Sequence, residues 1–236
     1  YMDTRKWGPE GWILLHAITF NYPQKPTQKD KTNHLLFFNT LQYILPCKYC
    51  RESFKEFMIE LPIDNNLDSR NKLSKWFYHI HNLVNNKLIK QGLLKIPNPS
   101  YQEIELKYNK ELNPLQLKFI YCIVFNYPHK KKLNSDIISY YFLFFSLLNN
   151  ILPNDNIRHI YSKGFNKYNI NCYLNSRFKL KQWLFKLNCY INKIICHKNS
   201  KYEDICNRYE SYRSGCSKKH FKGITCRMTK KHKMSH

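Results

Sequence analysis

Residues 7–16 read WGPEGWILLH, and this stretch does most to decide the fold. Proline is tolerated in the first turn of a helix, and the apolar and aromatic residues after it recur at intervals of three and four. Trp12 and His16 stand four positions apart, so a helix places both rings on one face, where they can wall a flat heterocycle or fill a core. We predict a helix here that ends near the NYP sequence of residues 21–23.

Helical spacing continues outward from this stretch through the first half of the chain. Apolar residues predict further helices over residues 35–45, from Cys47 onward, over residues 67–90 and within residues 100–110. Four or five short helices form a compact bundle, so the expected fold class is all-α. No run of about 18 apolar residues is present, so no membrane span is expected, and no secretory segment is seen near Tyr1.

The second half of the chain repeats the first at a shift of 105 to 107 positions. Residues 15–23, LHAITFNYP, return as residues 120–128, IYCIVFNYP. The pattern of residues 67–88 returns over residues 174–195. Several matches in the same order, across helical segments of one type, are most simply explained by a duplication.

The two copies differ where chemistry is expected. Packing positions persist, while reactive and polar aromatic positions of the first copy are replaced in the second: Trp12 by Leu117, His16 by Tyr121, Cys47 by Asn154, Cys50 by Ile157, His79 by Lys186 and His81 by Asn188. We therefore predict a working bundle over residues 1–110, a degenerate helical copy without a CxxC pair over residues 111–196, and a basic, cysteine-containing tail over residues 197–236.

The CxxC pair lies in LPCKYC, residues 45–50, and places two thiols one helical turn apart. Cys47 would sit at a helix N-terminus, where the helix dipole favours the thiolate. The pair could instead be half of a zinc site, since CxxC is half of many such sites. The other half would need His79 and His81, whose spacing of two points them in different directions on a helix. Taken alone, the pair fits redox and metal chemistry equally.

Together these motifs resemble a family, the Erv/ALR sulfhydryl oxidases. The resemblance rests on WGxxxWxxxH in residues 7–16, PCxxC in residues 46–50 and HNxVNxKL in residues 81–88, and it covers about residues 5–110. It implies a five-helix bundle that holds FAD beside the CxxC pair. It also implies a thiol oxidase in which electrons pass from protein dithiols through Cys47 and Cys50 to FAD and then to dioxygen, giving hydrogen peroxide.

The resemblance also implies roles for single residues. Cys50 would be the thiol next to the flavin, and Cys47 the one exposed to the incoming substrate. No metal ligands are implied. The residues expected to bind the cofactor are Gly8, Trp12, His16, His79, His81, Asn82, Val84, Asn85, Lys87, Lys90, Lys107 and Tyr108.

Many members of the family carry a second, shuttle pair of cysteines, and none stands before Trp7 or just after Lys87. Four later cysteines recur at intervals of ten and could serve instead, or form structural disulfides: Cys196, Cys206, Cys216 and Cys226. The chain has nine cysteines, so at least one thiol stays unpaired within it.

The formal net charge of +23 has two readings. A basic surface could attract nucleic acid or acidic partners, or the charge could reflect the Lys-, Asn-, Ile- and Tyr-rich composition of an AT-rich genome. The lysines are scattered, which favours composition and leaves nucleic acid at most an accessory partner. With the resemblance, this composition suggests a giant DNA virus of the mimivirus type, and a site of action in the viral factory, host cytoplasm or virion.

Two alternatives from other classes stay open, a zinc-stabilised interaction module and a nucleic-acid-binding protein on a relic oxidase fold. For the oxidase, the expected partners are protein dithiols and dioxygen, and no membrane. Since relatives of the fold often dimerise, we expect either a homodimer or an internal pseudo-dimer of the two copies.

Overall fold

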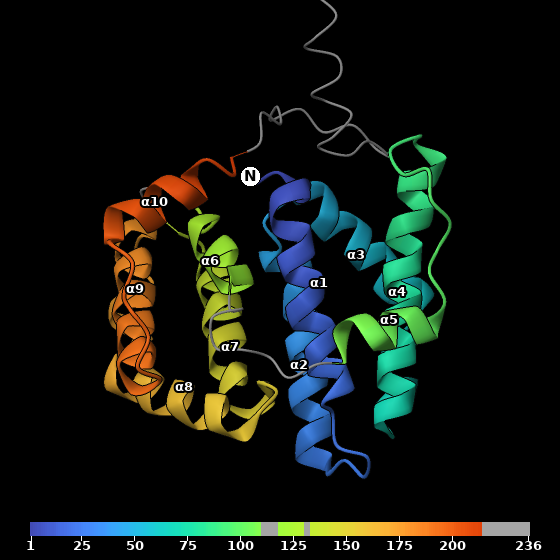
Figure 1. Cartoon of the computed structure of the whole chain (residues 1–236), viewed down its shortest axis with the longest axis horizontal. Helices are drawn as coiled ribbons and strands as arrows, with labels where there is room; N and C mark the ends of the chain where they lie inside the picture. The colour runs from blue at the N-terminus through green and yellow to red at the C-terminus, as the bar shows by residue number, and fades with distance from the viewer. Residues whose placement is uncertain (110–117, 130–132, 214–236) are drawn as a thin grey trace, which may run out of the picture.

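The computed structural model describes residues 1–109, 118–129 and 133–213, and within these ranges the chain forms ten α-helices and no strand (Figure 1). The predicted all-α class is confirmed. No helix of the described part is both long and apolar enough to cross a membrane. Part of the expected basic tail, including Cys216 and Cys226, lies outside the described residues.

The helices fall into two successive sets of five. The first set comprises α1 Thr4–Phe20, α2 Gln28–Ile44, α3 Lys48–Glu60, α4 Arg70–Lys90 and α5 Tyr101–Tyr108, with a 3-10 turn at Asp64–Asn66. The second set comprises α6 Lys118–Phe125, α7 Ser135–Ile151, α8 Asp155–Lys167, α9 Arg177–Ile194 and α10 Tyr202–Glu210, with a 3-10 turn at Ile170–Cys172.

Capping residues explain where the helices begin. Thr27 and Asp30 form a capping box, so α2 starts at Gln28, seven positions before the first residue of the predicted segment. Ser100 and Glu103 form the same box at the start of α5. These side chains satisfy backbone N–H groups that the first helical turn leaves without partners.

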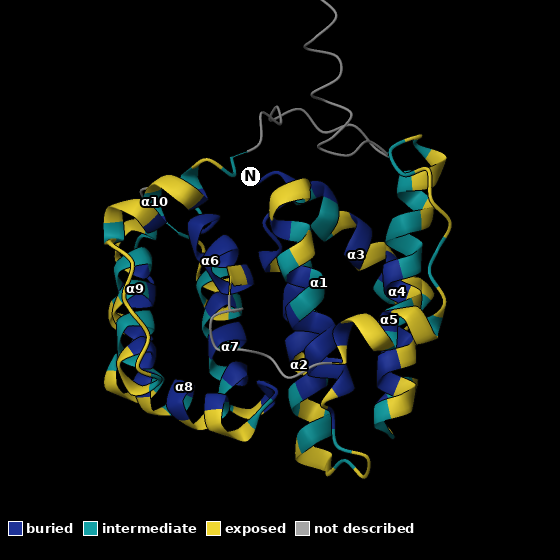
Figure 2. Cartoon of the chain, viewed as in Figure 1, coloured by how far each residue is buried: buried dark blue, intermediate teal, exposed yellow. Residues whose placement is uncertain are grey.

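The two sets share one core. Figure 1 shows α1 and α2 beside α6 and α7 in the middle of the molecule, and Figure 2 shows buried residues facing inward across this junction. On α2 and α7 the rings of Phe37 and Phe144 stack with centroids 5.2 Å apart, and those of Tyr43 and Tyr140 with centroids 3.7 Å apart. Apolar burial is therefore continuous from one set to the other.

The same long-range hydrogen bonds recur in both sets at the shift that relates the two halves of the sequence. The Trp76 indole N–H donates to the Leu61 carbonyl at 2.9 Å, and Trp183 donates to Tyr168 at 2.8 Å. Three more pairs of side-chain to carbonyl bonds repeat in the same way. The Tyr22 hydroxyl donates to the Leu67 carbonyl, as Tyr127 does to Leu174. The guanidinium groups of Arg70 and Arg51 donate to the carbonyls of Tyr22 and Leu45, as those of Arg177 and Arg158 do to Tyr127 and Leu152. The two sets thus repeat tertiary contacts as well as helix order.

Helix α10 belongs to the second set rather than to a separate tail. Tyr209 of α10 is buried and stacks on Tyr121 of α6 at 4.9 Å, much as Tyr108 of α5 stacks on His16 of α1 at 4.7 Å. The amphipathic helix that follows residue 196 thus packs back onto the bundle, and the domain bounds stay a prediction.

Candidate active site

The CxxC pair stands at the start of α3, as predicted. Cys47 is the N-cap residue and Cys50 lies in the first turn. Cys47 was expected to face incoming substrate, but in the structure it is 0% exposed. The segment before α1 packs against the loop that carries it, since the Met2 N–H donates to the Pro46 carbonyl at 2.8 Å.

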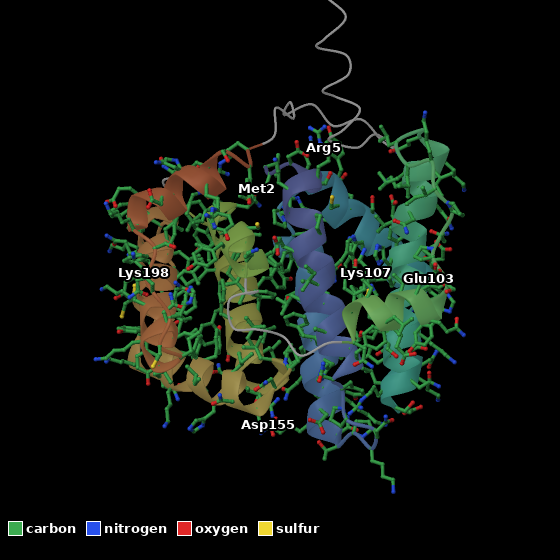
Figure 3. All side chains as sticks on the ribbon, in the orientation of Figure 1. Met2, Arg5, Glu103, Lys107, Asp155 and Lys198 are labelled. Atoms are coloured by element: carbon green, nitrogen blue, oxygen red, sulfur yellow. The ribbon has the colours of Figure 1, made fainter. Side chains whose placement is uncertain are left out.

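Residues just after α10 also hold this segment in place. The Asp3 N–H donates to the Tyr212 carbonyl at 2.7 Å, and Met2 forms an antiparallel bridge with Arg213. Figure 3 shows Met2 between the start of α1 and α10. The burial around Cys47 therefore involves residues nearly the whole described chain apart, which no local sequence pattern reports.

Cys50 lines a cavity of about 260 Å³ bounded by α1, α2, α3 and α4. The lining is mostly apolar. Five of the residues expected to bind a cofactor line it together with Cys50, namely Gly8, Trp12, Val84, Asn85 and Lys87. The structure thus places the predicted flavin-side thiol against a hollow lined by residues from both the first and third predicted motifs.

A cluster of stacked rings adjoins this cavity through Trp12. The His81 ring stacks on Trp12 with centroids 3.6 Å apart. His16 Nε2 and His81 Nδ1 are hydrogen-bonded at 2.9 Å, and the Tyr108 ring stacks on that of His16. These residues come from α1, α4 and α5, so the structure brings together His16, His81 and Tyr108 without placing them on the cavity wall itself.

The remaining predicted cofactor residues are more dispersed. His79 and Lys90 are exposed and do not line the cavity, so their role stays a prediction. Asn82 is half-buried, and its Oδ1 has no hydrogen-bond partner among the described residues. Lys107, labelled in Figure 3, lies with its Nζ 5.1 Å from the centre of the Tyr108 ring.

Some residues that line the cavity were not among those predicted to bind the cofactor. Trp7, Gly11, Ser53 and Phe77 line the cavity but were not assigned to it. Trp7 and Gly11 belong to the stretch that decides the fold, and Ser53 follows Cys50 by three positions, so helical spacing alone could have indicated it. Phe77 could not be told from a core residue by its pattern.

Opposing influences act on the Cys50 thiol. The hydrogen bond with Cys47 and then burial raise its pKa, whereas the positive charges of Lys87 and Arg51 lower it. Lys87 is held at the cavity because its Nζ donates to Ser53 Oγ at 2.5 Å. A fixed ammonium group near a partly buried thiol favours the thiolate form that reacts.

Replacing Lys87 by methionine is therefore expected to raise the pKa of Cys50. Methionine keeps the apolar length and removes the charge. The rate at which the reduced protein's Cys50 is alkylated should then rise at a higher pH than in the unaltered protein, as followed by peptide mass spectrometry. Lys90→Met, one turn beyond the cavity and exposed, is the control and should leave the profile in place. Identical profiles for both variants would contradict the assignment.

Three buried histidines make stability depend on pH. Burial lowers the pKa of His34 to about 4 and that of His81 to about 3, with Lys107 adding to the effect on His81. Burial, followed by the charges of His81 and Lys107, also holds the pKa of His16 well below its usual value. Each imidazole is therefore neutral in the folded state at a pH where the unfolded chain already binds a proton.

We expect the free energy of unfolding to fall as the pH falls from about 6.5 towards about 4, by at most about 1.4 kcal/mol per pH unit for each histidine. His34→Phe should flatten this dependence, because an aromatic ring also fills the equivalent place in the second set, at Tyr141, while the titrating group is gone. Urea denaturation at several pH values measures the slope. The exposed His79→Phe is the control, and a slope unchanged in His34→Phe would contradict this account.

The cavity fits the flat, apolar ring system of the expected FAD. Its volume is close to the lower end of the range of about 300–1,000 Å³ usual for ligand pockets, so it suits the ring system and not the whole dinucleotide. A Cβ built on Gly8 would meet nothing within 4 Å, so the wall is open at that point. Outside the cavity lining, His16 Nδ1 and Asn82 Oδ1 are buried and have no hydrogen-bond partner among the described residues, so each could form a hydrogen bond with a ligand.

The geometry of the described residues supports a metal site less than it supports a flavin site. No three His, Cys, Asp or Glu side chains there lie close enough together to hold a metal ion. In particular, His79 is exposed while His81 is buried against Trp12, so the two do not join Cys47 and Cys50 in one site.

Comparison with known proteins matches residues 9–102 to the Erv1 / Alr family. A protein named "Probable FAD-linked sulfhydryl oxidase" from Acanthamoeba polyphaga mimivirus is 41% identical over 85 residues, which are 36% of this chain and 59% of that protein. The mitochondrial FAD-linked sulfhydryl oxidase of Saccharomyces cerevisiae is 34% identical over 88 residues, 37% of this chain and 46% of that one. The chain thus spans less than two thirds of either relative.

Among solved structures, a crystal structure of an Erv1 variant from Saccharomyces cerevisiae aligns with 47% of this chain and 87% of its own. The TM-score is 0.41 and the sequence identity is 27%.

Proposed function

We propose that this protein is an FAD-dependent thiol oxidase that forms disulfide bonds in protein substrates, with dioxygen as the final electron acceptor, because residues 9–102 match the model of the Erv1 / Alr family. The observation that carries the proposal is the position of Cys50. One thiol of a CxxC pair lies on the wall of an apolar cavity that Trp12, Asn85 and Lys87 also line.

The cavity residues would hold the flavin ring, and the ring cluster beside it would hold more distant parts of the cofactor. Gly8 and Trp12 offer a flat wall from α1, while Asn85 and Lys87 offer polar groups from α4. When bound, FAD supplies an acceptor for the electron pair of a dithiol and a route from there to dioxygen.

The cysteines carry out thiol–disulfide exchange. A substrate thiolate attacks the Cys47 sulfur of the Cys47–Cys50 disulfide, forming a mixed disulfide and releasing Cys50 as a thiolate. A second substrate thiolate then attacks the substrate sulfur of that mixed disulfide and releases Cys47. The substrate leaves with one new disulfide, and two electrons and two protons stay with Cys47 and Cys50 as thiols.

Neighbouring residues would control these steps. Lys87 and Arg51 stabilise negative charge on Cys50 as it is released. Because Cys47 is buried, the segment at Met2 has to move before a protein thiol can reach its sulfur. The mostly apolar lining around Cys50 offers the thiolate few polar partners other than Lys87 and Ser53.

We also infer that the second set of helices is a duplicated copy of the first that has lost its chemistry. The repeated tertiary hydrogen bonds support common ancestry, since such bonds depend on distant residues. At the positions of Cys50 and Ser53 the second copy has Ile157 and Ile160, both buried. Apolar side chains thus stand where the first copy has reactive and polar ones.

The packing of α2 on α7 supports an internal pseudo-dimer rather than a homodimer through the same face. Phe37 and Phe144 are fully buried against one another, so this face of α2 is already covered within one chain. The relative from a mimivirus favours a viral origin, and the viral factory, host cytoplasm or virion remains the predicted place of action.

A visible absorption spectrum of the purified protein tests the function. We expect oxidised-flavin bands that bleach when dithiothreitol is added without air and return on admitting air, with hydrogen peroxide formed. A colourless protein with stoichiometric zinc would overturn the proposal and support the zinc-stabilised module instead.

A further inference from the structure

We infer that the second copy supplies a positioning residue for the cofactor site of the first, namely Phe119 of α6. This inference rests on the proposed function, since it concerns how the FAD cavity is shaped. The residues of α1 that line the cavity include Trp7, Gly8, Gly11 and Trp12. Two of them, Trp7 and Gly11, also lie against Phe119.

Gly11 is the point where α1 comes closest to Phe119. A Cβ built on Gly11 would lie 3.2 Å from Phe119 Cε2, 3.3 Å from Cδ2 and 3.5 Å from Trp7 Cζ3. The first two distances are tighter than nine in ten contacts that real Cβ atoms make. A side chain at position 11 would therefore require the Phe119 ring to shift by a few tenths of an ångström, which makes the positions of this ring and of α1 mutually dependent.

Trp7 lies between Phe119 and the cavity, so a change at Phe119 can alter the cavity wall. Its ring lines the cavity, is 7% exposed, and has its centroid 6.0 Å from that of Phe119. A smaller side chain at position 119 would leave a void behind Trp7, and neighbouring groups relax only partly into such voids. Movement of the indole into that void would widen the cavity and loosen the fit of a flat ring system.

The chain offers a matched control in Phe144. Phe119 and Phe144 are both fully buried phenylalanines of the second copy, and both pack across the junction between copies. Phe144 stacks on Phe37 of α2, and neither of these two residues lines the cavity. Equal truncation at both sites should cost similar stability while affecting the cavity only at one.

The test compares the dissociation constant of FAD in the full-length protein with those of Phe119→Leu and Phe144→Leu, measured by equilibrium titration of FAD fluorescence. We expect Phe119→Leu to bind FAD at least about tenfold more weakly, while Phe144→Leu stays within about threefold of the unaltered protein. Equal weakening in both variants, or none in Phe119→Leu, would overturn the inference. Failure of the unaltered protein to bind FAD would instead overturn the proposed function.

Gly11→Ala keeps the inference testable if Phe119→Leu does not fold. The nearest groups to the added methyl group are the Phe119 ring and, slightly farther away, the Trp7 ring, although alanine is otherwise favoured over glycine in a helix. We expect weaker FAD binding in Gly11→Ala, because the Phe119 ring has to shift to make room for the methyl group. Unchanged FAD binding in Gly11→Ala would count against a role for Phe119.

Discussion

The Cys50→Ser variant will retain FAD and lose the formation of disulfides. Serine keeps nearly the shape of the side chain on the cavity wall, so the cofactor site should survive, but its hydroxyl cannot form the Cys47–Cys50 disulfide. We expect turnover with dithiothreitol to fall by roughly three orders of magnitude or more, the scale on which removing a covalent nucleophile acts. Oxygen consumption and peroxide yield measure the loss, and the flavin absorption measures cofactor retained.

Two further variants sharpen this result. Cys47→Ser should be equally inactive, because exchange with substrate needs both sulfurs of the pair. Cys172→Ser, at an exposed cysteine of the second copy, is the control and should keep full turnover. If Cys50→Ser kept more than about a tenth of the original rate, the CxxC pair would not be the redox centre.

Trp183→Ala will destabilise the whole protein by about 3–5 kcal/mol, the usual cost of truncating a buried tryptophan. Trp183 is fully buried, meets Phe145 edge-on with centroids 4.9 Å apart, and donates its indole N–H to the Tyr168 carbonyl. Urea denaturation followed by circular dichroism gives the loss. Because the core runs from α2 into α7 without a break, one cooperative transition is expected at a lower urea concentration.

Matched variants separate the ring from its hydrogen bond. Trp183→Phe keeps a ring and loses the bond to Tyr168, which should cost the bond's roughly 1 kcal/mol and part of the packing. Trp76→Phe removes the equivalent bond to Leu61 and should cost a similar amount if the two copies are built alike. Two separate unfolding transitions in Trp183→Ala, with only one of them shifted, would show that the copies fold independently.

Much of the fold could be read from local sequence because its determinants are local. The apolar spacing around residues 7–16 predicted a helix, and α1 spans them. The start of α3 at the CxxC pair followed from the proline before Cys47. Where prediction fell short, as at the start of α2, the signal was also local and was the Thr27–Asp30 capping box.

The site was only partly predictable, because cavity walls are made by residues that are distant in the chain. His79 and His81 stand two positions apart in the sequence, yet one is exposed and the other is buried against Trp12. Which of them joins the ring cluster depends on the direction that α4 presents to α1. Both were expected to bind the cofactor, and the sequence cannot distinguish them without that packing.

By itself the sequence determined the helical class, the placement of the CxxC pair and the repeat that relates the two halves, because spacing and capping act within a few residues of each position. Only the tertiary structure decided that Cys47 is buried, that α10 completes the second set, and that Phe119 lies against Gly11. Each of these depends on contacts between segments far apart in the chain, where side-chain shape and the available space select the partner.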